Sequence, residues 1–115
     1  MTLTNVGSFI AATEKDADTL VNIVNTNLKS YMKCISLPDF IKTNNNTFEC
    51  EINEVYGDLE NPLKQIVKKC CQNHVHAEFS ISYYGDYEGM YVFKNGVFEV
   101  KSADMITTQK TVFNH

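Results

Sequence analysis

A strict alternation of apolar and polar residues between Val75 and Tyr84 constrains the fold of this chain more than any other feature. The apolar positions are Val75, Ala77, Phe79, Ile81 and Tyr83. Because neighbouring side chains on a strand point to opposite faces, this spacing predicts a strand with one buried face and one wet face. Such strands are typical of antiparallel sheets, so one face of the sheet should be open to solvent.

Another stretch has the apolar spacing of a long amphipathic helix. Thr13 with Asp16 resembles a capping box, and the apolar stripe behind it runs from Ala17 to Met32. A first helix is therefore expected over about residues 14–34, and Pro38 would stop any continuation.

Asn61-Pro62 predicts the start of a second helix, because asparagine is a good N-cap and proline suits the first helical position. The buried stripe of this helix is Leu63, Ile66, Val67, Cys70 and Cys71. Shorter apolar segments predict further strands at residues 6–12, 39–42, 48–53, 90–94 and 97–100. Asn95-Gly96 predicts a hairpin between the last two.

The resulting order is β-α-β-β-α-β followed by a hairpin, which predicts an α+β two-layer sandwich of the ferredoxin-like type. Residues 1–101 would form one domain, and residues 102–115 a C-terminal extension that is an edge strand, a short helix or a loose tail. With both helices on one face, the predicted open face carries Glu49, Glu51, His76, Glu78, Ser80, Ser82 and Tyr84.

All ten basic residues are lysines, and fourteen acids bring the formal net charge to -4. Arginine is the usual residue for holding phosphates through a two-pronged contact, so the composition argues against binding of nucleic acid, nucleotides or anionic lipid. Five acids stand between Thr47 and Glu60 without a base. RNA-binding domains with this element order surround their exposed aromatics with bases, whereas an acidic face repels RNA. The expected partner is a basic protein.

The chain has no apolar run near the roughly 20 residues that span a bilayer. Its first eight residues lack the basic region and long apolar stretch of a signal peptide. We therefore expect a cytoplasmic protein, with no membrane contact and with its cysteines reduced.

The segment from Tyr83 to Tyr91 combines four tyrosines, two acids and two freely turning glycines. Aromatic residues are enriched in recognition surfaces because they bury a large area at little entropic cost. Combined with the acids of the open face, the predicted partner-binding residues are Glu49, Glu51, Glu78, Tyr84, Asp86, Tyr87, Glu88 and Tyr91. The simpler alternatives are tyrosines packed into the core and acids that serve solubility alone.

Cys70, Cys71, His74 and His76 offer four candidate zinc ligands within seven residues. Adjacent cysteines on a helix point about 100° apart, and the apolar stripe already accounts for both. A cysteine, Cys34 and Cys50 included, could also pair with a histidine as a nucleophile, yet nothing marks one as exposed and activated. His115 is terminal. We expect no enzyme, metal or cofactor, and a metal- or ligand-binding module or enzyme on this cluster is the alternative.

The stretch from Leu63 to Val100, a third of the chain, resembles the YubB-type ferredoxin-like domain of phage and plasmid proteins. The matching residues are Phe79-Ser-Ile-Ser-Tyr-Tyr-Gly-Asp-Tyr-Glu-Gly-Met-Tyr-Val-Phe-Lys-Asn-Gly96. That resemblance implies a ferredoxin-like fold, and the family has no established activity to carry over.

In general character the chain is small, acidic and without a catalytic motif, and in this it resembles phage-encoded inhibitors of host defence, including anti-CRISPR proteins. This similarity implies a stoichiometric inhibitor of a basic, nucleic-acid-handling host protein such as a CRISPR effector, acting in the host cytoplasm. A toxin-immunity protein would have the same features, because it also neutralises a basic partner. A monomer and a homodimer both fit; acidic faces repel, so a dimer would form through an edge strand or the C-terminal segment.

Overall fold

Most of the alternating segment forms strand β4 (Ala77–Gly85), with Phe79, Ile81 and Tyr83 buried on one face. Val75 and His76 lie before this strand, so the predicted start is two residues early. Phe79 lies at the centre of the core. Its ring contacts that of Phe9 at a centroid distance of 5.4 Å and that of Phe98 at 6.0 Å, both edge-on. The strand that the alternation predicts is therefore also the one that carries the middle of the aromatic core.

The computed structural model describes residues 3–32 and 40–113, and within them it is an α+β structure, as predicted. The other elements are β1 (Leu3–Ala11), α1 (Glu14–Leu28), η1 (Lys29–Tyr31), β2 (Ile41–Lys42), β3 (Phe48–Tyr56), α2 (Glu60–Gln72), β5 (Gly89–Lys94), β6 (Val97–Ser102) and β7 (Thr107–Val112). Neither described helix is long and apolar enough to cross a membrane.

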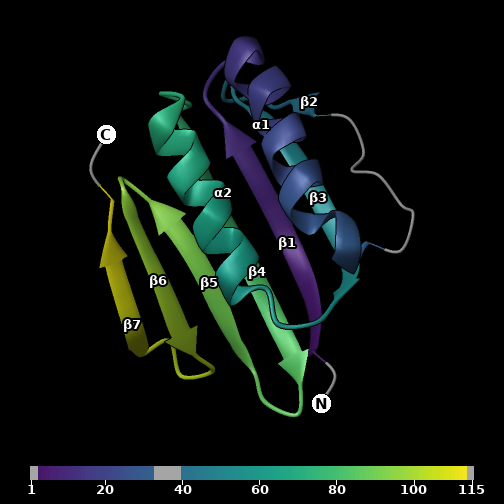
Figure 1. Cartoon of the computed structure of the whole chain (residues 1–115), viewed down its shortest axis with the longest axis vertical. Coiled ribbons are helices and arrows are strands. Elements are labelled where there is room, and N and C mark those ends of the chain that lie inside the picture. The colour runs from purple at the N-terminus through teal and green to yellow at the C-terminus, as the bar shows by residue number, and fades with distance from the viewer. Residues whose placement is uncertain (1–2, 33–39, 114–115) are drawn as a thin grey trace.

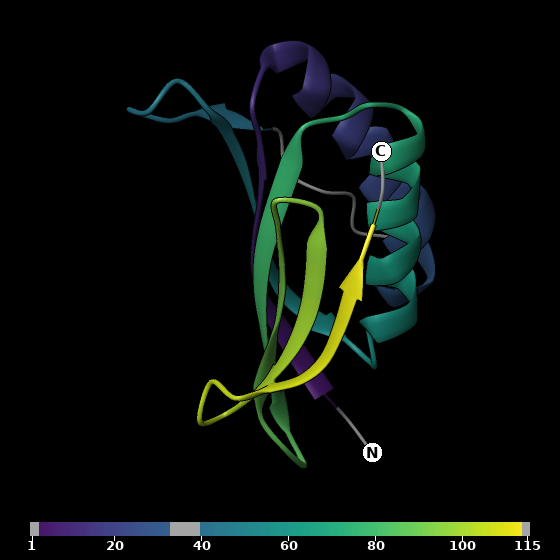
Figure 2. The same cartoon turned by 90° about the vertical axis from the view of Figure 1, so that its left-hand side faces the viewer.

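All strands belong to one antiparallel sheet with the order β2-β3-β1-β4-β5-β6-β7 (Figure 1). Helix α1 joins β1 to β2 across β3, and α2 joins β3 to β4 across β1. Both helices cover the same face of the sheet, and the other face carries no helix (Figure 2). The core lies between these two layers and includes Leu20 and Val24 of α1 and Leu63 and Ile66 of α2.

Two helix boundaries differ from the prediction. Helix α1 ends at Leu28, and a tighter 3₁₀ turn continues to Tyr31; Cys34 and Pro38 lie outside the described residues. Helix α2 begins at Glu60, so the prediction of Asn61 as its N-cap is wrong. Pro62 still fits, because the first helical turn has no intrahelical partner for its N–H groups.

The hairpin between β5 and β6 has positive backbone φ angles in its turn. The turn between β5 and β6 has φ of 53° at Asn95 and 77° at Gly96, as the Asn-Gly signal predicts. Of the three alternatives for the C-terminal stretch, an edge strand, a short helix and a loose tail, the structure has the edge strand. This strand is β7, which pairs antiparallel with β6.

Candidate protein-binding surface

The uncovered face of the sheet brings three predicted acids together. Ile10 of β1 pairs with Glu49 of β3 on one side and with Glu78 of β4 on the other. The next row on this face places Ser8 beside Glu51. Because neighbouring strands lie about 4.8 Å apart, the Cα atoms of Glu49 and Glu78 are separated by about 10 Å. We call Glu49, Glu51 and Glu78 the acidic trio.

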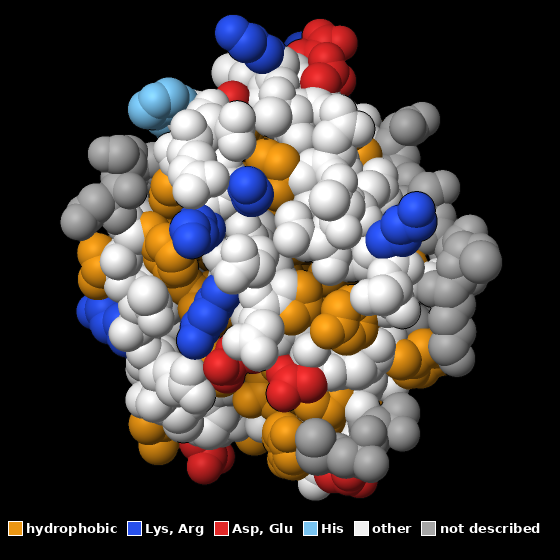
Figure 3. Space-filling view, in the orientation of Figure 1, with side chains coloured by type: hydrophobic (Ala, Val, Ile, Leu, Met, Phe, Trp, Pro, Cys, Tyr) orange, Lys and Arg blue, Asp and Glu red, His pale blue; other side chains and the backbone are white. Residues whose placement is uncertain are grey.

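No lysine of the described residues forms an ion pair with the acidic trio. Within residues 3–32 and 40–113, the one ion pair joins Lys64 Nζ to Glu60 Oε2 at 3.5 Å, and it lies on α2. Lysine side chains gather over α2 on the helix-covered face, with acids at the lower end of that face (Figure 3). The positive charge of α2 is thus on the opposite side of the molecule from the acidic trio.

The open face is not acidic throughout. The rows of the sheet continue from β4 into β5, β6 and β7, where Met90 pairs with Lys101 and Glu99 pairs with Lys110. The Glu99 carboxylate accepts a hydrogen bond from the Thr107 hydroxyl. The predicted open face, acidic and polar, thus describes β3 and β4 only, and on β5 to β7 lysines alternate with Glu99.

The loop between β4 and β5 presents the other predicted residues. Tyr84 is 47% exposed on the open face, and Tyr87 is 48% exposed with its ring edge-on to Tyr83 on the helix side. Asp86 and Glu88 are exposed between them. Tyr84 lies six positions after Glu78 on β4, or about 20 Å of extended chain, so the loop and the acidic trio are two patches.

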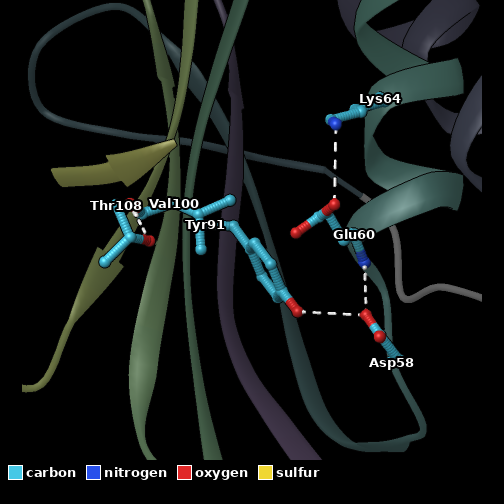
Figure 4. A network of polar contacts seen from close by, with 6 residues as sticks. All are labelled: Asp58, Glu60, Lys64, Tyr91, Val100 and Thr108. Atoms are coloured by element: carbon cyan, nitrogen blue, oxygen red, sulfur yellow. Dashed lines mark hydrogen bonds and ion pairs between the residues drawn. The ribbon is translucent and has the colours of Figure 1, made fainter. Parts of the chain in front are cut away.

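Tyr91 belongs to the core and cannot supply contact area to a partner. It is 3% exposed, and its hydroxyl donates a hydrogen bond to Asp58 Oδ1 at 3.4 Å. Figure 4 shows its ring pointing from the sheet toward the start of α2, where Asp58 also accepts from the Glu60 N–H. Burial and the adjacent Asp58 carboxylate raise the pKa of Tyr91 far above its ordinary value. The prediction that placed Tyr91 on the surface is corrected.

Two hollows lie at opposite ends of the sheet. A hollow of about 390 Å³ is lined by Ile10, His76, Glu78 and Phe93, among others. A second, of about 400 Å³, lies between the β4–β5 loop and the β6–β7 turn. Its lining includes Tyr84 and Glu88, which were predicted, and Met90 and Met105, which were not. No sequence signal marked Met105, because its turn exists only where residues 102–115 form a strand.

The Cys70, Cys71, His74 and His76 cluster is explained by the end of α2. The Val75 N–H donates to Cys70 O at 2.9 Å and the His74 N–H to Cys71 O at 3.3 Å, with His74 at φ 54°. These bonds make a Schellman motif, which closes helices through a left-handed residue.

Neither thiol of this cluster has the environment of a nucleophile. Cys70 and Cys71 are both buried, and burial raises the pKa of the Cys70 thiol to about 12. Among the residues that the structure describes, no group of three or more His, Cys, Asp or Glu side chains could hold a metal ion. Cys34 and His115 lie outside the described residues.

Comparison of the chain with protein families, with curated proteins and with solved structures finds no match. The surface must therefore be interpreted from its own geometry and charge.

Proposed function

We propose that this protein is a small, non-catalytic inhibitor that binds a basic protein partner in stoichiometric contact. The observation that carries the proposal is the acidic trio on the helix-free face, which has no lysine partner in the described chain. Carboxylates placed in this way attract a basic groove over long range and form charge-assisted hydrogen bonds at contact. The exposed Tyr84 and Tyr87 would add apolar area at the second patch.

A nucleic-acid-handling protein is the partner class that fits this chemistry, because its basic groove normally faces phosphates. The resemblance to phage-encoded inhibitors of host defence supports a CRISPR effector as one such target in the host cytoplasm. A toxin-immunity protein that covers a basic toxin would use the same surface.

We also propose that β1 to β4 with the two helices form a ferredoxin-like unit. Two observations support it: each helix joins strands that have one strand between them, and all four strands are antiparallel in the order β2-β3-β1-β4. The β5–β6 hairpin and β7 then extend this unit at the β4 edge.

The function is tested by capture of a partner from a bacterial lysate with matched charge variants. Glu49→Lys/Glu51→Lys removes two acids of the open face, and Glu14→Lys/Asp18→Lys removes two exposed acids of α1. Both pairs change the formal net charge from -4 to 0, so solubility effects are shared. We expect one basic protein near one-to-one, released by salt and lost only in the open-face variant. Equal loss in both variants would contradict the proposal.

A further inference from the structure

A mostly apolar hollow of about 400 Å³ is lined by the β4–β5 loop and the β6–β7 turn. These segments lie at the end of the sheet where β4 and β6 finish, which is at the bottom of Figure 1. Ser82 and Met90 pair across β4 and β5 to form its floor, and Met90 Sδ accepts a hydrogen bond from Ser80 on the open face. We call Ser82, Tyr84, Glu88, Met90 and Met105 the methionine pocket.

Two exposed large apolar side chains line this pocket, Tyr84 at 47% and Met105 at 54% exposure. Ile106, which follows Met105, is 63% exposed, and Tyr56 lies two strands from Tyr84 on the same face. Exposed apolar residues that cluster in this way mark interaction sites, whereas singly scattered ones need no explanation. Methionine is also common at binding surfaces because its flexible thioether adapts to different partners.

Met105 occupies a backbone position that normally takes glycine or asparagine. Its φ is 62°, in the tight turn closed by the Met105 N–H to Ser102 O bond and the Ser102 N–H to Ile106 O bond, each of 2.9 Å. A left-handed conformation is costly for a residue with a Cβ atom. The chain thus places an exposed apolar side chain beside the pocket where glycine would give a more stable turn.

The rim of the pocket is more acidic than basic. Asp86, Glu88 and Asp104 are exposed in its two loops, and one lysine, Lys101, pairs with Met90 of the floor. A basic partner is complementary to this rim, whereas a second copy would bring the same acids together.

We propose that the methionine pocket takes one apolar side chain from a basic segment of the partner, with flanking lysines or arginines on Asp86, Glu88 and Asp104. This inference rests on the proposed function, because it takes the partner to be basic. It adds that recognition needs an apolar anchor as well as charge.

The test uses two synthetic peptides with three lysines on each side of a central leucine or serine. Their affinities for the full chain are measured by calorimetry at low salt. The leucine peptide should bind about 10-fold more tightly, as expected when a leucine side chain is buried. Met105→Gly should remove most of this preference and yet raise the unfolding midpoint by about 4 °C, because the turn is relieved.

His74→Gly is the matched control, since it also relieves a left-handed residue but lies at the other end of the sheet. It should raise the unfolding midpoint and keep the leucine preference. A wild-type chain that binds both peptides equally would overturn the pocket and leave the proposed function standing. Binding of neither peptide would contradict both. Self-association of the chain that Met105→Gly abolishes would assign the pocket to a second copy instead.

Discussion

His74 occupies the left-handed position that ends α2, and its side chain is exposed. This conformation is sterically unfavourable for a residue with a Cβ atom. Glycine adopts it without strain, and its only disadvantage is the larger backbone entropy that it loses on folding. His74→Gly should therefore raise the free energy of unfolding by about 1 kcal/mol. His74→Ala should give no gain, because alanine has the same Cβ atom. Urea unfolding of the three proteins measures the difference, and equal stability of both variants would contradict this account of the helix end.

The buried thiols predict how stability depends on pH. Burial raises the pKa of Cys70 from 9.0 to about 12, so the unfolded chain loses this proton at a lower pH than the folded chain. The stabilisation is complete below pH 9 and is lost as the pH rises from 9 to about 12. Tyr83 and Tyr91 act in the same direction above pH 10, because burial raises both pKa values.

Thermal unfolding between pH 7 and pH 11 would show this loss of stability on the alkaline side. A Cys70→Ala variant should start from a lower stability, because it leaves a cavity, and should lose less of it between pH 9 and pH 11. A variant whose alkaline decline matches that of the wild type would show that Cys70 does not contribute to the effect.

At the scale of elements, β1 is held so closely between β3 and β4 that Gly7 has no room for a side chain. A Cβ atom at Gly7 would lie 2.6 Å from Ile81 Cα and closer still to Ser80 O, both of which are backbone atoms. Gly7→Ala should thus lower the free energy of unfolding by about 3 kcal/mol or prevent folding, because a strand in the middle of a sheet cannot move aside.

Ser8→Ala is the control for Gly7→Ala, because Ser8 lies on the open face of the same strand. It should change the free energy of unfolding, measured in urea, by no more than about 0.5 kcal/mol. Similar losses in the two variants would mean that β1 tolerates displacement and that its packing against β4 is looser than described.

Local patterns in the sequence account for most of these elements. The alternation around Phe79 predicted β4, and Asn95-Gly96 predicted the β5–β6 hairpin, because both signals lie within a few residues. The start of α2 was predicted two residues late. The Asp58 carboxylate accepts a hydrogen bond from the Glu60 N–H at the true start, and helix propensities do not predict this contact. The sequence alone did not decide whether residues 107–112 form a strand. These residues are mostly polar, and they form β7 by pairing with β6.

At the scale of the whole molecule, the sequence predicted the part of the candidate surface that depends only on the alternation of side chains between the two sheet faces. Glu49, Glu51 and Glu78 were assigned to one face by strand periodicity, and the strand register places them in adjacent rows. Tyr91 was misplaced because the chain turns at Gly89 and returns its ring to the core. Met105 was missed because its turn exists only where β7 pairs with β6, and no local pattern in the sequence predicts that pairing.

The central claim is that the acidic trio and the β4–β5 loop bind a basic protein surface. Amide correlation spectra of the chain titrated with octalysine at low salt test it most directly. The account predicts shifts in β3, in β4 and in residues 84–88, which fade in high salt and in Glu49→Lys/Glu51→Lys but persist in Glu14→Lys/Asp18→Lys. Shifts confined to α1 and α2, or unchanged by the open-face variant, would contradict it.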